Sequence, residues 1–308
     1  MKNRIFKYSL FVILVLAADQ LVGTFIAHFS AKQVRDNRVE LLLNKEINSE
    51  IIILGSSRAL NNYNPEIISA TTGLSCYNLG VSGSNILFHE TMLDLVIQYG
   101  NQPKMIIYNI DDYGTLFKMD GVIYRKDVLY PYVDNGLIHK NISRETKKNE
   151  IASMLMKTYR QNVNFNNAIK YFVYGREAVD YKTTNFDKTG ANILVQRPED
   201  PIPVFGTETE FVLSKKADTL LVDAFKRIQR KCLENNVELV LVIPPLFKND
   251  TKGFKEMLMP FIEKNIFVMD LTGTLQEAKY FYNKDHMNRE GARLFSNTVA
   301  ETINKRNF

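Results

Sequence analysis

The sequence contains few of the residues that build metal and redox sites. It has two cysteines, Cys76 and Cys232, and four histidines that show no ligand spacing to one another or to a cysteine. A zinc site is therefore not expected, and nothing in the sequence indicates a cofactor. Both cysteines fall in segments typical of a core, which favours buried small hydrophobic side chains, while a disulfide between them stays open.

Features of nucleic-acid and nucleotide binding are also missing. The formal net charge is only +5, and no dense Lys/Arg cluster with interleaved aromatic residues is present, which argues against a nucleic-acid partner. There is no P-loop lysine and no Gly-x-Gly-x-x-Gly motif, which argues against a nucleotide-binding domain. The remaining composition, 45% hydrophobic and 24% charged, is that of a globular protein. A chain of 308 residues can form one large domain, or one domain with an insertion.

The amino terminus has the features of a membrane anchor. An apolar stretch at residues 8–29 has roughly the 20 residues of a membrane-spanning helix, and it follows three basic residues, Lys2, Arg4 and Lys7. The basic flank should stay in the cytoplasm, so the rest of the chain is expected outside it. A cleaved signal peptide is the alternative, because Val15-Leu16-Ala17 is an acceptable cleavage pattern. We favour an anchor over residues 1–30, because the apolar stretch resumes after Asp19-Gln20.

Asp19 itself lies inside the apolar stretch, where a carboxylate is costly in lipid. Either it faces a partner helix, or it snorkels or lies in a shallow defect of the bilayer. Residues 31–50 are charged and polar with some leucines, which predicts a linker helix that leads from the membrane to a domain at residues 51–308.

Five short apolar segments are spaced like the strands of a parallel sheet. The first, residues 51–54, is a run of four apolar residues that ends at Gly-Ser-Ser, which is typical of a buried strand. Further strands are predicted at 75–79, 104–110, 237–243 and 266–271. Helices are predicted after a polar turn in 59–70 (starting at Asn64-Pro65-Glu66), at 86–99, 214–235 and 253–264, and up to about 303. This alternation predicts an α/β fold, a flavodoxin-like three-layer α/β/α sandwich with a parallel five-stranded sheet.

The middle of the chain, residues 113–209, interrupts this pattern. It is polar and rich in tyrosine, and a structureless loop of that length would be unusual in a compact domain. We expect an insertion that forms a lid or substrate platform, with helices near 147–160 and 166–174. Its tyrosines could stack on sugar rings, although ordinary packing of a small subdomain accounts for most of them.

Candidate catalytic residues meet at one edge of the predicted sheet. The loops after the first three strands should converge there, because the carboxyl ends of parallel strands share an edge. These loops carry Ser56, Ser57 and Gly83, and His286 precedes the last helix. A serine, a histidine and nearby backbone amides are the minimum set for nucleophilic acyl transfer. His286 would accept the serine proton, and amides near Ser57 and Gly83 would hold the oxyanion. Without the other two loops, the serines are equally well explained as helix caps.

The order of these residues resembles that of the SGNH (GDSL-like) hydrolase superfamily. Three segments carry the resemblance: Gly55-Ser56-Ser57, Asn78-x-Gly80-x-Ser82-Gly83 and Asp285-His286-Met287-Asn288-x-x-Gly291. The resemblance implies Ser57 as the nucleophile, Gly83 as an oxyanion donor and His286 as the general base. It covers residues 51–112 and 215–305 and leaves the insertion unexplained.

The chain departs from the family's pattern at two places. The asparagine that usually follows the third strand as an oxyanion donor has Asn109 as its best substitute, and this side chain can instead point into the sheet. The acid that is common three residues before the histidine is replaced by Asn283, which can orient an imidazole without stabilising imidazolium by charge. Asp285 is the alternative orienting residue, unless it only places a charge at a helix N-terminus. A Ser-His dyad is a third arrangement.

The Gly-Ser-Ser segment and the predicted anchor resemble extracytoplasmic proteins of cell-envelope glycan acylation, such as alginate O-acetylation and teichoic acid D-alanylation factors. The resemblance implies a serine esterase or O-acyltransferase that acts on acylated glycan. The alternative is a catalytically inactive accessory protein that binds glycan or, through the first helix and Asp19, a multi-pass membrane acyltransferase. Hydrolysis and transfer differ only in the acceptor that reaches the acyl-enzyme, so both stay open.

Overall fold

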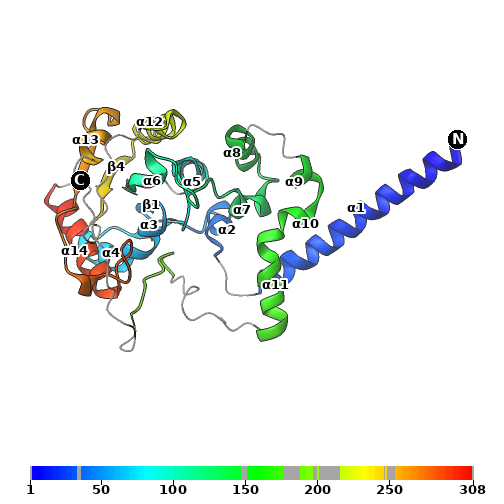
Figure 1. The fold of residues 1–308 in the computed structure, drawn as a ribbon, viewed down its shortest axis with the longest axis horizontal. Helices are drawn as coiled ribbons and strands as arrows, with labels where there is room; N and C mark the ends of the chain where they lie inside the picture. Colours follow the sequence, from blue (N-terminus) through cyan, green and yellow to red (C-terminus); the bar gives the residue numbers. More distant parts are fainter. Residues whose placement is uncertain are drawn as a thin grey trace. The chain divides into compact units, whose positions relative to one another are not determined.

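The computed structural model of the chain forms two compact units (Figure 1). The anchor unit consists of Met1–Glu40 and Arg125–Thr184, and the sheet unit consists of Leu41–Tyr124 and Asn185–Phe308. The structure describes residues 2–32, 36–100, 102–146, 151–175, 188–196, 200, 216–245, 247 and 254–306. The segment expected as an insertion, 113–209, thus contributes to both units.

The sheet unit is built on five parallel strands in the order β2-β1-β3-β4-β5. The strands are β1 (Ile51–Leu54), β2 (Cys76–Asn78), β3 (Met105–Asn109), β4 (Glu238–Ile243) and β5 (Phe267–Asp270). Every neighbouring pair is parallel and continuously registered, as Ile53 opposite Ile107 and Tyr108 opposite Leu241 illustrate. This is the doubly wound order in which the two halves diverge between β1 and β3. All five predicted strands are confirmed.

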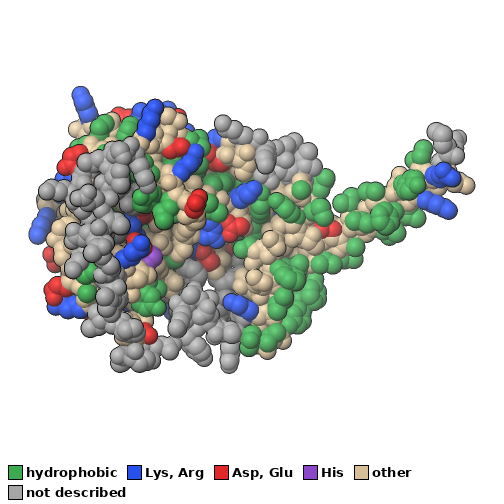
Figure 2. Space-filling view, in the orientation of Figure 1, with side chains coloured by type: hydrophobic (Ala, Val, Ile, Leu, Met, Phe, Trp, Pro, Cys, Tyr) green, Lys and Arg blue, Asp and Glu red, His purple; other side chains and the backbone are tan. Residues whose placement is uncertain are grey.

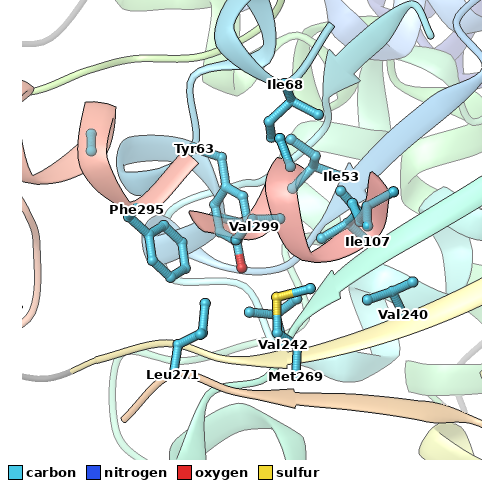
Figure 3. Packing of buried hydrophobic residues seen from close by; sticks show 14 of the residues in the cluster. Ile53, Tyr63, Ile68, Ile107, Val240, Val242, Met269, Leu271, Phe295 and Val299 are labelled. Atoms are coloured by element: carbon cyan, nitrogen blue, oxygen red, sulfur yellow. The ribbon is translucent and has the colours of Figure 1, made fainter. Parts of the chain in front are cut away.

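Helices cover both faces of this sheet, which confirms the three-layer α/β/α sandwich. One layer contains α3 (Ser57–Asn62), α4 (Pro65–Thr72) and α14 (Arg289–Lys305), and the other contains α5 (Ile86–Tyr99) and α12 (Thr219–Glu234). Figure 3 shows how alternate strand residues such as Ile53, Ile107 and Val242 pack against Phe295 and Val299 of α14. Successive strand side chains point to opposite faces, so the residues between them face α5 and α12. Burial on both faces explains why the strands read as continuous apolar runs.

Asparagines cap two helix starts, of which the first confirms the start predicted at Asn64-Pro65-Glu66 and the second was not predicted. Asn64 caps α4, because its Oδ1 accepts hydrogen bonds from the amides of Glu66 (3.0 Å) and Ile67 (3.4 Å), and Pro65 occupies the first helical position. Asn85 caps α5 through the amide of Phe88. The helix α12 begins at Thr219, later than predicted, while residues 214–215 of the prediction lie outside the described residues.

Other boundaries were wrong in part. The polar turn predicted at the start of 59–70 is instead part of the helix α3, which runs from Ser57 to Asn62 and makes Ser57 a first-turn helix residue. The helix predicted at 253–264 is a short α13 (Phe254–Leu258) followed by the 3-10 helix η2 (Met259–Phe261), because Pro260 cannot continue an α-helix; Gly253 lies outside the described residues. Of the linker helix predicted at 31–50, the described residues, which leave out 33–35, contain α2 (Arg38–Leu43). The remaining short elements of the sheet unit are α6 (Asp112–Thr115) and η3 (Ala278–Tyr280).

Both cysteines are buried free thiols in the sheet unit, which settles the open question of a disulfide. Burial raises the pKa of Cys76 well above its usual range and that of Cys232 to about 12, so neither thiol is a reactive thiolate at neutral pH. Among the residues that the structure describes, no group of three or more His, Cys, Asp or Glu side chains is arranged to hold a metal ion.

The regular elements in the described part of the anchor unit are helices. Its longest element is α1 (Lys2–Ser30), which is long and apolar enough to cross a membrane. The other elements are α7 (Lys126–Leu129), η1 (Tyr130–Tyr132), α8 (Gly136–Thr146), α9 (Ile151–Leu155), α10 (Lys157–Arg160) and α11 (Asn162–Tyr174). The helix predicted at 147–160 is broken at Met156, whose backbone is extended, and its residues 147–150 lie outside the described residues.

Candidate active site

Ser57 and His286 are brought together at the carboxyl edge of the sheet. Ser57 begins α3, with only Gly55 and Ser56 between it and the end of β1, and His286 lies in the loop between β5 and α14. The Nε2 atom of His286 is 2.7 Å from the Oγ atom of Ser57, and both side chains are partly exposed. The structure therefore places a serine hydroxyl and an imidazole in direct hydrogen-bonding contact at a solvent-accessible position.

Asn283 holds the other side of the imidazole. Its Oδ1 atom accepts hydrogen bonds from the backbone amides of Asp285 (3.0 Å) and His286 (2.9 Å), which identifies this atom as the oxygen of the side-chain amide. The same oxygen lies 3.0 Å from Nδ1 of His286, so Nδ1 must carry the proton. The Nε2 atom then has a free lone pair, and the hydroxyl of Ser57 donates to it. This is the tautomer in which a histidine can act as a base.

Hydrogen bonds to neighbouring elements hold the loop that carries His286. Asn62, at the end of α3, accepts a hydrogen bond from the amide of Met287 (3.0 Å). Asn288 caps α14 by accepting from the amide of Gly291 (3.0 Å), and its Nδ2 atom donates to the carbonyl of Lys279 (2.7 Å). The asparagine and glycine of the sequence motif therefore fix the loop, rather than contact the serine.

The loop after β2 packs closely on α3. Asn78 accepts a hydrogen bond from the amide of Gly80 (2.9 Å) and donates to the carbonyl of Ala59 (2.7 Å). A side chain at Gly80 would place its Cβ atom 2.5 Å from the backbone nitrogen of Leu60, so only glycine permits this approach. The contact holds the glycine-rich loop beside the helix that begins at Ser57.

Two backbone amides remain available for an oxyanion. Gly83 has a positive φ of 68°, a conformation that favours glycine. Within the described chain, the amides of Ser57 and Gly83 have no hydrogen-bond partner, whereas the Gly83 carbonyl accepts from Ile123 (2.9 Å). An unpaired amide at a helix N-terminus and one in a glycine loop are the kinds of donor that stabilise tetrahedral intermediates.

Asn109, the expected substitute donor, is placed differently. It is fully buried, its Oδ1 atom accepts from the hydroxyl of Tyr63 (2.9 Å), and its Nδ2 atom donates to Asp111 (3.0 Å). Both ends of the side chain are therefore engaged inside the protein, and the structure does not bring it to the exposed side of Ser57. We assign Asn109 a role in positioning the end of β3.

Asp285, the alternative orienting residue, does not contact the imidazole ring. Its carboxylate lies 3.7 Å from the guanidinium of Arg58, whose other nitrogen is 3.1 Å from the carboxylate of Asp111. Ser56 also donates a hydrogen bond to Asp111, which gives this serine a structural partner and leaves Ser57 to the histidine. The ion pair of Arg58 and Asp111 was not predicted, because it joins two different loops and no motif marks either residue.

The environment keeps His286 neutral at ordinary pH. Burial, together with the positive charge of Arg58, lowers the pKa of His286 to about 4, and Asp285 opposes the shift in part. The basic form of the imidazole therefore dominates at neutral pH. A pKa this low also means that proton transfer from serine to His286 receives less driving force than it would with a carboxylate behind the ring.

A second Ser-His pair joins the end of the glycine-rich loop, where Ser84 follows Gly83, to His89 of α5. Nε2 of His89 is 2.7 Å from Oγ of Ser84, and both residues are buried. The hydroxyl of Ser84 donates to the carbonyl of Val81 (2.5 Å), so the imidazole must donate from Nε2 and accept from the hydroxyl of Tyr108 at Nδ1 (3.0 Å). Burial lowers the pKa of His89 to about 3. This pair supports the loop that follows β2.

Comparisons with known proteins identify no family for this chain and a distant structural similarity. No family model matches it, and no curated protein matches it. Among solved structures, it is similar to a protein of Desulfitobacterium hafniense DCB-2 described as a candidate lipolytic protein of the G-D-S-L family, with 14% identity and a TM-score of 0.38 over 82% of this chain and 99% of that chain. The function proposed below therefore rests on the geometry of the chain itself.

Proposed function

We propose that this protein is a serine ester hydrolase or O-acyltransferase of the SGNH type. Ser57 attacks an ester carbonyl while His286 takes its proton, and the amides of Ser57 and Gly83 hold the oxyanion. The tetrahedral intermediate collapses as His286 returns the proton to the leaving alcohol, which yields an acyl-Ser57 ester. Water or a sugar hydroxyl, deprotonated by His286, then attacks the acyl carbonyl, and His286 returns the proton to the Ser57 oxygen as it leaves, which restores both side chains.

One observation carries this proposal: the continuous contact from Ser57 Oγ to His286 Nε2, and from His286 Nδ1 to Asn283 Oδ1. The hydrogen bonds of Asn283 fix the ring orientation and the tautomer, which are two of the tasks of a triad acid. Asn283 brings no negative charge, and the carboxylate of Asp285 raises the pKa of His286 and so favours imidazolium formation in part.

We further propose that α1 anchors the protein, with the sheet unit on the extracytoplasmic side. The basic residues ahead of the apolar stretch support this orientation. A cleaved signal peptide remains the competing use of the same helix. Acylated cell-envelope glycan is the proposed substrate class, and its support is the resemblance of the Gly-Ser-Ser segment and the anchor to glycan acylation proteins.

A non-catalytic accessory role is the second candidate. The observation that favours it is Asn283 in the place of an acid, because the charge that usually supports imidazolium is absent from the far ring nitrogen. In this alternative, the edge near Ser57 would bind glycan or a membrane acyltransferase without forming an acyl-enzyme.

Mass spectrometry of the full chain in detergent with p-nitrophenyl acetate separates the two candidates. An enzyme is expected to release p-nitrophenol and to carry an acetyl group on the peptide that contains Ser57. The Ser57→Ala variant should lose both signals, whereas Ser84→Ala should keep them, because the proton of Ser84 is donated to a carbonyl. Absence of any Ser57 adduct at saturating ester would support the accessory role.

A further inference from the structure

The carboxyl-terminal half of α1 is docked onto other helices of the anchor unit. The carboxylate of Asp19 accepts hydrogen bonds from the amides of Lys157 and Thr158 and from the hydroxyl of Thr158, so it caps the start of α10. Gln20 donates to the carbonyl of Leu155 (2.9 Å), and the ammonium of Lys157 donates to Thr24 (2.9 Å). Of the two interpretations of Asp19, the structure favours contact with a partner helix, which lies within the same chain.

Aromatic contacts continue this docking onto α11. Phe172 stacks on Phe25 with ring centres 5.6 Å apart and contacts Phe29 at 4.6 Å. The ammonium of Lys32 lies 4.8 Å from the ring centre of Phe29 and 5.6 Å from that of Tyr171. Tyrosine and lysine are residues that gather at the boundary between lipid tails and headgroups, because each joins an apolar body to a polar end.

The length of α1 sets the depth of these contacts. If Lys7 marks the inner boundary, a hydrocarbon core of about 30 Å at 1.5 Å per residue extends roughly 20 residues, to near residue 27. Asp19 lies only about 18 Å along the helix from Lys7. The start of α10, which Asp19 caps, therefore falls within the outer half of the hydrocarbon core, and a tilted helix would place it deeper still.

The residues held at this depth expose apolar side chains. Met154, Leu155 and Met156 are 40–56% exposed, and the carbonyl of Leu155 accepts the hydrogen bond from Gln20. On α11 an exposed stripe at helical spacing consists of Phe165, Ile169, Phe172 and Val173, and it is continuous with exposed Phe25 of α1 through the stacked rings. Figure 2 shows hydrophobic side chains gathered along α1 and over the helices packed on it. An exposed apolar surface of this kind indicates a protein or membrane contact.

We propose that α9, α10 and α11 are embedded in the outer leaflet of the membrane, with the stripe of α11 and residues 154–156 in contact with lipid. The occupant is lipid rather than protein, because the surface adjoins the part of α1 that lies at hydrocarbon depth. This inference rests on the proposed anchoring by α1 and extends it from a single helix to a helical membrane-bound unit. The capping of α10 explains how the carboxylate of Asp19 is tolerated at that depth.

Depth-dependent fluorescence quenching in liposomes tests this proposal with the full chain. Single cysteines are introduced as Ile169→Cys on α11, Leu14→Cys on the exposed part of α1 and Leu233→Cys, an exposed leucine on α12 of the sheet unit. Each is labelled with an environment-sensitive dye and mixed with phospholipids that carry a quencher at a shallow or deep acyl position. The unsubstituted chain, whose two thiols are buried, is the blank.

The emission of the dye at residue 169 is expected to shift to the blue and to be quenched by shallow quenchers. The emission of the dye at residue 14 should also shift to the blue and be quenched by deep quenchers. The dye at residue 233 should show no shift and no quenching. If the dye at residue 14 is quenched and the dye at residue 169 behaves like the dye at residue 233, the proposed embedding of α9, α10 and α11 is wrong, while the anchoring by α1 is supported. If the dye at residue 14 is not quenched, the proposed anchoring by α1 is wrong. This result leaves the proposed esterase activity untouched, because that activity is tested separately by the acetyl adduct on Ser57. A blue shift at 169 that depends on protein concentration without lipid quenching would indicate a second copy and overturn the proposal. Phe165→Cys replaces Ile169→Cys if the latter does not fold.

Discussion

Two serine-histidine pairs in the sheet unit have the same separation and opposite chemistry. In both, a serine Oγ atom and a histidine Nε2 atom are 2.7 Å apart. At Ser57 and His286, Asn283 fixes the proton on Nδ1, so the hydroxyl donates to the ring. At Ser84 and His89, the hydroxyl proton is held by a carbonyl, so the ring donates to the serine.

This difference shows that proximity does not make a serine nucleophilic. The hydrogen-bond partners of the far ring nitrogen and of the hydroxyl decide whether the serine or the imidazole donates the hydrogen bond between them. The exposure of the serine decides whether a substrate can reach its oxygen. The pair at Ser57 meets both conditions, while the buried pair at Ser84 meets neither. Substitutions at the two pairs should therefore have opposite consequences for activity and for stability.

Removing each histidine should affect ester turnover very differently. His286→Ala is expected to lower the rate of p-nitrophenyl acetate hydrolysis by about 10²–10⁴-fold, the usual contribution of a general base. His89→Gln, which keeps a polar side chain in the buried network, should leave the rate of the folded protein within a few-fold of the original. Equal losses in the two folded variants would show that the tautomer distinction has no catalytic meaning.

The residue behind His286 should control the pH profile. Because the neutral ring is the base, hydrolysis should be retained at neutral pH and fall as the pH drops through about 4, the pKa of His286. Asn283→Asp places a negative charge beside Nδ1, which raises this pKa and moves the acid limb to higher pH.

The matched control is Asp285→Asn. The carboxylate of Asp285 raises the pKa of His286, so its removal should move the acid limb slightly to lower pH, opposite to the effect of Asn283→Asp. Profiles of kcat/KM for the unsubstituted chain and the two variants give the comparison, and an acid limb that does not respond to either change would exclude His286 as the titrating base.

Stability should show the reverse ranking of the two serines. Ser84→Ala leaves the Nε2 proton of His89 without a partner in a buried site, which should cost about 1–3 kcal/mol of unfolding free energy. The carbonyl of Val81 still accepts from the backbone amide of residue 84 (3.3 Å). Ser57→Ala alters a partly exposed pair and should change stability by roughly 0.5 kcal/mol or less. Thermal unfolding in detergent, followed by circular dichroism, measures both, and a larger loss for Ser57→Ala would contradict the assignment.

A smaller effect is expected in the pH dependence of stability. The folded-state pKa of His89 is depressed to about 3, so the unfolded chain binds a proton near pH 6.5 that the folded protein does not. Stability is therefore complete above the unfolded pKa and declines as the pH falls toward 3. When the pH falls from 7 to 6, the protonation of this histidine in the unfolded chain should lower the free energy of unfolding by about 0.7 kcal/mol. His89→Gln should remove that part of the slope, and an unchanged slope would place the titration elsewhere.

The sequence predicts the sheet and the serine-histidine pair well, because strand periodicity and the parallel edge depend only on local pattern and topology. The choice between Asn283 and Asp285 depends on the turn, where two backbone amides orient the Asn283 oxygen toward the ring. The orientation of Asn109 likewise depends on Tyr63 and Asp111, which meet it only in the folded sheet.

Contacts between distant segments could not be predicted from one sequence. The capping of α10 by Asp19 joins residues that are 138 positions apart, and neither residue carries a motif. The helix α3 was missed for another reason: six residues with two asparagines have little helical signal, and packing against β3 and α14 stabilises them.

Labelling of the full chain with a fluorophosphonate probe across a pH series tests the difference between the two pairs most directly. The probe reacts only with a serine whose proton can be removed, so it distinguishes Ser57 from Ser84. We predict one labelled peptide, the one that contains Ser57, with labelling lost in Ser57→Ala, kept in Ser84→Ala and declining as the pH falls toward 4. No labelling of the folded chain at neutral pH, or equal labelling of Ser57→Ala, would contradict the assignment of Ser57 as the nucleophile.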